Sequence, residues 1–176
     1  LKMASEKSAV GEEFFRLADE KAGNNLLHRL AGAKKADVFG KPSLKGDVTS
    51  PDNLFKFQAM VMRELAEQES CVFVGRAAGY VLDQDEEIEN LVRIFVYADR
   101  VRRVQRVMEV DCISEERAKK RIRKIENERK NYYKYFNGHD WKNMKNYDLP
   151  INTTRLGLDE TAELIKEYVK LRGYMK

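Results

Sequence analysis

The residue of this chain with the clearest chemical potential is Arg129, which lies in a stretch with a helical pattern that starts at Ser114. Ser114 suits an N-cap, and the two acids that follow it suit the first turn of a helix. A stripe of apolar residues at helical spacing surrounds Arg129 and consists of Ala118, Ile122, Ile125, Tyr132 and Phe136. A guanidinium inside such a stripe needs an anionic partner. It either snorkels to a local carboxylate, as long side chains do, or binds a phosphate, and we prefer the phosphate.

Positive charge is concentrated around Arg129. The whole chain holds 33 Lys and Arg against 29 Asp and Glu, a net charge of +4. Residues 100–146 alone hold 15 basic and 7 acidic residues, so this stretch carries +8 and the remainder is net negative. The field is therefore local, which favours an anionic ligand at one place over a generally basic protein. A solvated helix face would explain Lys119 and Lys120 equally well.

Length and composition predict a globular protein with one core. The chain has 176 residues, of which 43% are hydrophobic and 35% charged. No apolar run approaches the roughly 20 residues that span a bilayer, and no signal peptide is visible, so we expect no membrane partner. Cys71 and Cys112 lack the spacing of metal ligands and no histidine clusters with them, so we expect no metal site made by these side chains. Cys71 begins a strand-like run and is expected to be buried and reduced, which fits a cytoplasmic location.

Three short apolar runs that alternate with helical patterns predict a parallel α/β fold. The runs are residues 71–74, 92–97 and 147–151, and helices are expected over residues 12–30, 52–67, 101–110 and 157–171, with an irregular loop over residues 32–51. Ligands of open α/β sheets lie at the carboxyl ends of the strands. Arg76 directly follows the first run and Thr154 follows the third, which makes both of them candidates for a binding site.

The order and spacing of several segments resemble the cytidylate kinase-like family, a branch of the P-loop nucleoside monophosphate kinases. The resemblance covers roughly residues 54–170 and is carried by Arg63-Glu64-Leu65-Ala66, Cys71–Arg76, Ile94–Ala98, Arg103, Arg106, Ile113–Glu116, Arg129, Tyr132-Tyr133, Gly138, Trp141 and Asn146–Leu149. It implies a three-layer α/β fold, in which a parallel P-loop kinase-like sheet is flanked by helices. A single domain over residues 1–176 would then include a helical monophosphate-binding region at 12–68 and a lid region at 112–146.

The resemblance also implies phosphoryl transfer from ATP, with Mg²⁺, to a nucleoside monophosphate, for which we expect CMP or dCMP. Such transfer relies on positioning and on neutralised charge, and guanidinium forks suit phosphate oxygens. The matching positions are Arg129 (the lid arginine) and Arg103 for catalysis, Arg63 and Arg76 for the monophosphate, and Arg106, Lys124 and Thr154 for ATP. Lys124 and Glu126 flank the lid arginine, and the family more often has Asp where Glu126 stands.

One departure from the family is serious, because the pattern G-x-x-x-x-G-K-[ST] does not occur in the sequence. We expect the strand and phosphate-binding loop that carry it to precede Leu1. The alternative is a nucleotide-binding protein without catalysis. A kinase for another small molecule stays open, and single-stranded nucleic-acid binding through residues 117–134 ranks third, since Glu126 and Glu128 interrupt that positive face. The sequence does not indicate an oligomeric state.

Each candidate also has a purely structural explanation. Arg76 could be a surface turn residue, and Thr154 could satisfy a turn. Arg103 and Arg106 could pair with Glu109 or Asp99 near their own helix. The aromatic residues between positions 132 and 136 could serve packing alone, or they could stack on a base.

Overall fold

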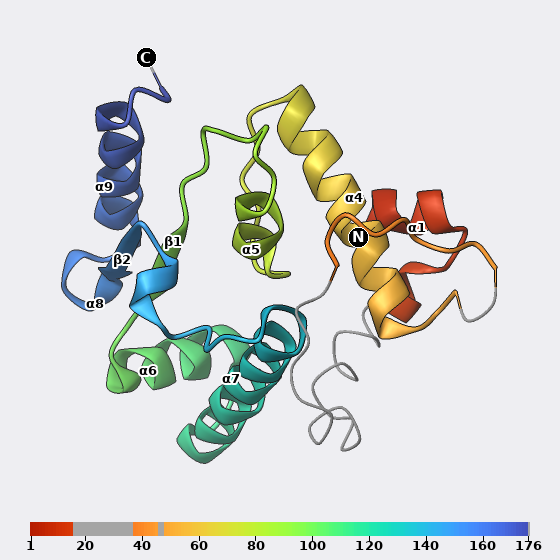
Figure 1. Ribbon diagram of the computed structural model, residues 1–176. Coiled ribbons are helices and arrows are strands. Elements are labelled where there is room, and N and C mark those ends of the chain that lie inside the picture. The colour runs from red at the N-terminus through yellow and green to blue at the C-terminus, as the bar shows by residue number, and fades with distance from the viewer. Residues whose placement is uncertain (16–36, 46–47, 176) are drawn as a thin grey trace. The chain divides into compact units, whose positions relative to one another are not determined.

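A computed structural model describes residues 1–15, 37–45 and 48–175 of the chain. Over these residues the fold is mixed α/β and mostly helical, with one two-stranded parallel sheet. The elements in chain order, as Figure 1 labels them, are α1 (Lys2–Ser8), α4 (Pro51–Gln68), α5 (Ala78–Asp83), β1 (Ile94–Tyr97), α6 (Arg100–Asp111), α7 (Glu115–Asn137), the 3-10 helix η1 (Met144–Asn146), β2 (Leu149–Asn152), α8 (Thr153–Leu156) and α9 (Leu158–Leu171).

The chain divides into two compact units. Unit 1 comprises Leu1–Leu91 and Asn127–Lys142, and unit 2 comprises Val92–Glu126 and Asn143–Lys176. Helix α7 therefore supplies its N-terminal half to unit 2 and its C-terminal half, from Asn127 onward, to unit 1.

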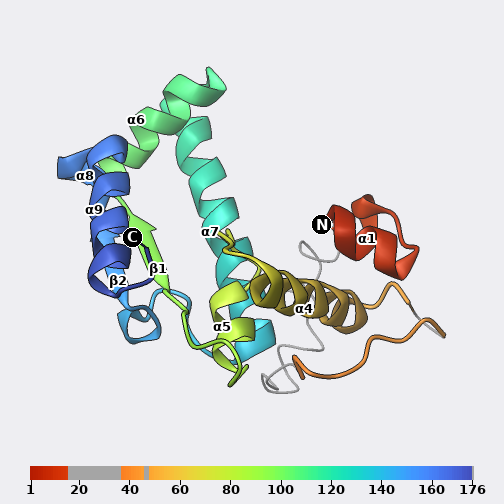
Figure 2. The ribbon, with the colours of Figure 1, turned by 90° about the horizontal axis from the view of Figure 1, so that it is seen from above.

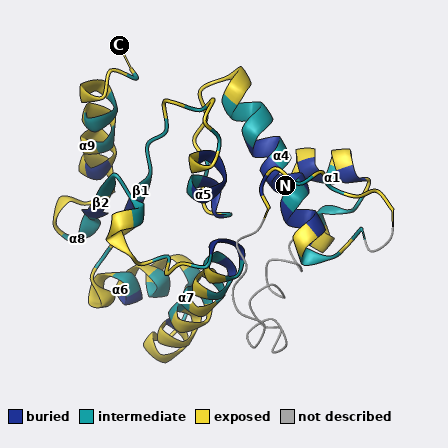
Figure 3. Ribbon diagram, viewed as in Figure 1, coloured by how far each residue is buried: buried dark blue, intermediate teal, exposed yellow. Residues whose placement is uncertain are grey.

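Helix α4 organises unit 1 because it carries apolar residues on two faces. It begins at Pro51, and the Ser50 hydroxyl accepts a hydrogen bond from the backbone N–H of Asn53, which is standard N-capping. One face packs with α1 around a core cluster of Ala4, Phe15, Leu54, Phe57 and Val61. The other face packs with α5 and with the C-terminal half of α7 around Phe55, Ala59, Met62, Ala78, Val81, Tyr132 and Phe136. Figure 2 shows α5 beside α4, and Figure 3 shows the buried positions of both helices in dark blue.

Unit 2 is built on the two parallel strands and on the helices that follow them. Ile94 pairs with Leu149 and Tyr97 with Asn152 in the register of the ladder. Just before the paired residues, the Asp148 carboxylate accepts hydrogen bonds from the backbone N–H of Arg93 at 2.7 Å and from the Arg93 guanidinium at 3.2 Å. The backbone carbonyl of Arg93 in turn accepts from the N–H of Asp148 at 2.8 Å. This reciprocal contact fixes the start of the sheet.

Most of the predicted elements are confirmed. The helices expected over residues 52–67, 101–110 and 157–171 and after Ser114 are α4, α6, α9 and α7, and the runs at 92–97 and 147–151 contain β1 and β2. The helix expected over residues 12–30 lies mostly outside the described residues. The described parts of the loop at 32–51 contain no helix or strand before Pro51.

The prediction of a buried strand at residues 71–74 is wrong. The segment is not a strand, Val72 and Val74 are 93% and 89% exposed, and Cys71 is exposed rather than buried. A β-branched run forms a strand only where a neighbour supplies ladder hydrogen bonds and burial. Within the described ranges the sheet consists of β1 and β2 alone, so nothing there pairs with this segment.

The Asp148 carboxylate makes the stability of unit 2 depend on pH. Burial alone would raise the pKa of Asp148, but the hydrogen bonds and the charge of Arg93 outweigh burial and hold this pKa below its usual value. A pKa that is lower in the folded than in the unfolded state stabilises the fold above the unfolded value. That contribution disappears as the pH falls through the folded value.

We expect Asp148→Asn to lower the free energy of unfolding at neutral pH by roughly 1.5–3 kcal/mol, the usual worth of hydrogen bonds to a charged group. The deficit should shrink as the pH falls below about 4 and disappear below the lowered pKa of Asp148, where the wild-type carboxylate is neutral as well. Urea denaturation at the two pH values measures both effects. Glu163→Gln, which removes the exposed partner of Lys166, is the control and should change stability little. A deficit that is equal at both pH values would assign the loss to packing instead of charge.

Candidate functional site

Arg63 lies on α4 in unit 1 and combines a fixed position with an unused donor. Its guanidinium carbon stands 4.6 Å from the centre of the Phe39 ring, which is cation–π geometry. Its Nη1 atom is buried and has no hydrogen-bond partner among the residues that the structure describes. A buried donor without an acceptor costs about 1–3 kcal/mol, so the N–H marks a place where an acceptor is expected.

Arg76 lies in unit 1 in a turn of unusual backbone conformation. Gly75, Arg76 and Ala77 have positive φ angles of 76°, 56° and 52° in succession. Glycine adopts this region freely, whereas a residue with a Cβ atom pays about 1–2 kcal/mol. The turn is held because the N–H of Ala78 donates to the carbonyl of Gly75 at 3.0 Å, and because Ala77 and Ala78 are buried in the core. Backbone strain that persists in a folded protein is a reason to look for function at that position.

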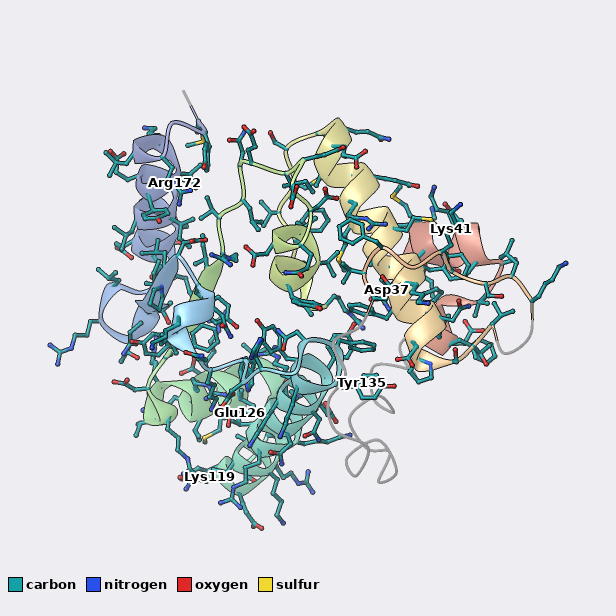
Figure 4. The ribbon with its side chains drawn as sticks, in the orientation of Figure 1. Asp37, Lys41, Lys119, Glu126, Tyr135 and Arg172 are labelled. Atoms are coloured by element: carbon teal, nitrogen blue, oxygen red, sulfur yellow. The ribbon has the colours of Figure 1, made fainter. Side chains whose placement is uncertain are left out.

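Arg103 of unit 2 is tied to α7 by an ion pair. Its Nη1 donates to Oε1 of Glu126 at 2.6 Å, and both side chains are about one-third exposed or less. The partner is thus Glu126, at the position where the family more often has Asp, and not Glu109 or Asp99. Figure 4 labels Glu126 on α7. This ion pair holds the guanidinium of Arg103 in place against α7.

Thr154 lies where the two strands end, as the sequence predicts for a ligand site. Its hydroxyl accepts a hydrogen bond from the backbone N–H of Asp99 at 2.7 Å, and the Asn152 amide donates to the Asp99 carboxylate at 3.1 Å. The Thr153 hydroxyl donates to the carbonyl of Tyr97 at 3.3 Å. These bonds join the carboxyl ends of β1 and β2, so the hydroxyl of Thr154 has a structural role in unit 2.

The remaining candidates are exposed. Arg106 on α6 and Lys124 on α7 face solvent in unit 2, and Arg129 is exposed on the part of α7 that belongs to unit 1. Ala118, Tyr132 and Phe136 of the apolar stripe around Arg129 are buried, whereas Arg129 itself is exposed. An exposed guanidinium keeps its hydration and needs no partner in the protein, so Arg129 remains available to a ligand.

Tyr132 is a candidate whose hydroxyl sequence reasoning missed. Tyr132 was expected to pack or to stack on a base, yet its buried hydroxyl has no hydrogen-bond partner among the described residues. The signal in the sequence was the residue type itself, since phenylalanine would fill an apolar position on α7 equally well.

No membrane-spanning or metal-binding element is found in the described part of the chain. None of its helices is long and apolar enough to cross a bilayer, and no group of three His, Cys, Asp or Glu side chains is placed to hold a metal.

The chain belongs to the cytidylate kinase-like family, whose sequence model matches residues 1–155. A solved structure of an uncharacterized protein from Eubacterium ventriosum is similar, with a TM-score of 0.63 and 27% sequence identity. That similarity covers 67% of this chain and 73% of the other. No curated protein matches the sequence. Membership of the family indicates a nucleotide kinase role.

The strain at Arg76 can be measured by comparing two substitutions that both remove the side chain. We expect Arg76→Gly to be more stable than Arg76→Ala by about 1 kcal/mol, because only glycine avoids the Cβ penalty of a positive φ angle. Urea denaturation gives the difference. Ala9→Gly calibrates it, since Ala9 is an exposed residue of unit 1 with the same φ of 56°. Equal stability of the two Arg76 variants would show that the turn is relaxed.

Proposed function

We propose that this protein transfers the terminal phosphoryl group of ATP to a nucleoside monophosphate, with CMP or dCMP as the acceptor. Family membership supports a nucleotide kinase, and the observation that carries the choice of site is the buried Nη1 of Arg63, which lacks an acceptor in the described residues. A phosphate oxygen is the acceptor that best suits a guanidinium fork.

Arg63 and Arg76 of unit 1 bind the acceptor phosphate in this proposal. The ring of Phe39 holds the Arg63 guanidinium in place, so little side-chain entropy is lost when a phosphate binds. Arg76 is presented by a turn whose strained backbone is kept by the buried Ala77 and Ala78. Both arginines are thus positioned before the ligand arrives, which is what phosphoryl transfer requires of its binding groups.

The transfer itself needs charge to be neutralised. An oxygen of the monophosphate forms a bond to the terminal phosphorus of ATP while the bond from that phosphorus to the bridging oxygen breaks, and ADP leaves. Arg129 acts on the transferring group from its exposed position on α7. Arg103, which Glu126 orients, is the second arginine that we assign to catalysis. We assign the binding of ATP to Arg106, Lys124 and Thr154.

The proposal requires a phosphate-binding loop, which residues 1–176 do not contain in its usual pattern. It also requires the three-layer sheet of a P-loop kinase, which is larger than the two-stranded sheet of the described residues. A second candidate is a protein that binds the monophosphate without catalysis. A full-length protein that binds CMP but neither binds nor consumes ATP would select this second candidate.

We expect Arg63→Met to weaken binding of CMP by about tenfold to a hundredfold and to leave ATP binding unchanged, because it removes the donor to a charged acceptor and keeps an apolar stem. Calorimetric titration with each nucleotide measures both affinities. Lys7→Met is the matched control, since Lys7 pairs with Glu64, the next residue on α4. Unchanged CMP affinity combined with a lower melting temperature would confine Arg63 to packing on Phe39.

We expect Arg129→Lys in the full-length protein to lower kcat by about a thousandfold while leaving the melting temperature nearly unchanged, because lysine keeps the charge but loses the fork. The loss should appear in kcat and not in KM if Arg129 acts only on the transferring group. Steady-state kinetics with CMP and ATP tests this, and Lys130→Arg, at the next exposed position, is the control. A normal kcat would show that Arg129 is a solvated helix residue.

A further inference from the structure

The hydroxyl of Tyr132 is buried in the core of unit 1 and has no hydrogen-bond partner among the described residues. The buried side-chain polar atoms without a hydrogen-bond partner among the described residues are Gln58 Oε1, Arg63 Nη1 and Tyr132 Oη. Tyr132 is 9% exposed, and buried tyrosine hydroxyls nearly always find a partner. Phenylalanine would give the same packing without the cost of a buried polar atom, so this oxygen calls for an explanation.

The ring of Tyr132 is held in place by its aromatic neighbours. Its centre lies 6.5 Å from that of Phe55 at an interplanar angle of 63°, and 4.7 Å from that of Phe136 at 60°. Phe55 and Phe136 are themselves stacked, with ring centres 3.9 Å apart. We call these three residues the aromatic cluster. These ring contacts fix the direction of the Tyr132 side chain and therefore of its hydroxyl.

The Arg76 guanidinium is a cation whose field reaches this hydroxyl. Burial raises the pKa of Tyr132 well above its ordinary value, and the Arg76 guanidinium acts in the opposite direction. The hydroxyl therefore keeps its proton at any physiological pH, and it lies within the field of a cation. A protonated tyrosine can donate and a guanidinium can only donate, so a group that both of them contact has to be an acceptor. The cation makes an anionic acceptor the favoured one.

We infer that Tyr132 is a ligand-positioning residue, whose hydroxyl donates a hydrogen bond to an oxygen of the same phosphate that Arg76 binds. The inference rests on the proposed function, in which this phosphate belongs to the acceptor monophosphate. It adds a neutral donor to the two arginines and assigns that donor to the phosphate and not to the base. The aromatic cluster then serves recognition as well as packing, because it aims the hydroxyl.

The decisive variant is Tyr132→Phe, which deletes one oxygen and keeps the ring. We expect it to weaken binding of CMP by about tenfold, to leave the weaker binding of cytidine unchanged, and to leave the melting temperature equal or slightly higher. Tyr135→Phe is the matched control on the same helix, because the Tyr135 hydroxyl, labelled in Figure 4, donates to Asp52 at 2.9 Å. This variant should lower the melting temperature and leave CMP affinity intact.

A double-mutant cycle adds a readout that a structural role would not move. If both side chains hold one phosphate, the loss of CMP affinity in Arg76→Gln combined with Tyr132→Phe is smaller than the product of the two single losses. Independent losses would overturn the shared contact.

The outcomes separate the inference from the proposed function. A wild-type protein that binds CMP as tightly as Tyr132→Phe does would overturn the inference alone and assign the hydroxyl to a buried water. Equal weakening of CMP and cytidine would move the hydroxyl to the nucleoside and overturn its assignment to the phosphate. A wild-type protein that binds neither CMP nor ATP would overturn the proposed function and the inference with it.

Discussion

The contact between Phe55 and Phe136 is the interaction on which the candidate acceptor site depends. The two rings are stacked and almost fully buried, with 1% and 2% of each residue exposed, and they join α4 to the C-terminal half of α7. Aromatic pairs combine a large buried area with a preferred geometry, so they fix direction as well as distance. Helix α4 carries Arg63, and α7 carries Tyr132 and Arg129. The contact between the two rings therefore fixes the backbone positions from which these three side chains extend.

In unit 2 the equivalent role belongs to a polar contact. Arg93 and Asp148 bind each other through backbone and side chain at once, at the point where β1 and β2 begin. Two strands alone bury little, and an isolated pair of strands is marginal in water. A salt bridge with several hydrogen bonds compensates for that, and it fixes the register that brings Asp99, Asn152 and Thr154 together at the other end of the strands.

The helices and the two paired strands could be predicted from the sequence because their signals are local. Residues 52–67 show a helical period with a cap, and residues 92–97 and 147–151 are short and apolar between turns. Cys71–Val74 has the same local signal as β1, but a strand also needs a neighbour, and the neighbour is not encoded in four residues. Local sequence likewise placed Arg129 in an apolar stripe but could not tell that its side chain is exposed while Tyr132 and Phe136 are buried.

The site was harder to predict for the same reason. Arg103 pairs with Glu126, 23 residues away, and a contact of that range depends on how α6 and α7 pack. The positive φ of Gly75 could be expected from its residue type, whereas those of Arg76 and Ala77 could not, since residues with a Cβ atom rarely adopt it. The role of the Tyr132 hydroxyl appears only when burial and the lack of a partner are known together.

The strained turn at Arg76 has a consequence for how this sequence changes over evolutionary time. Mutation supplies glycine and asparagine at any position sooner or later, and at φ 56° both of these residues fit the backbone better than arginine. Drift under selection for folding alone would therefore remove the arginine. A lineage in which position 76 stays arginine is under pressure from a ligand, and a lineage released from that ligand should lose this residue before it loses the core around it.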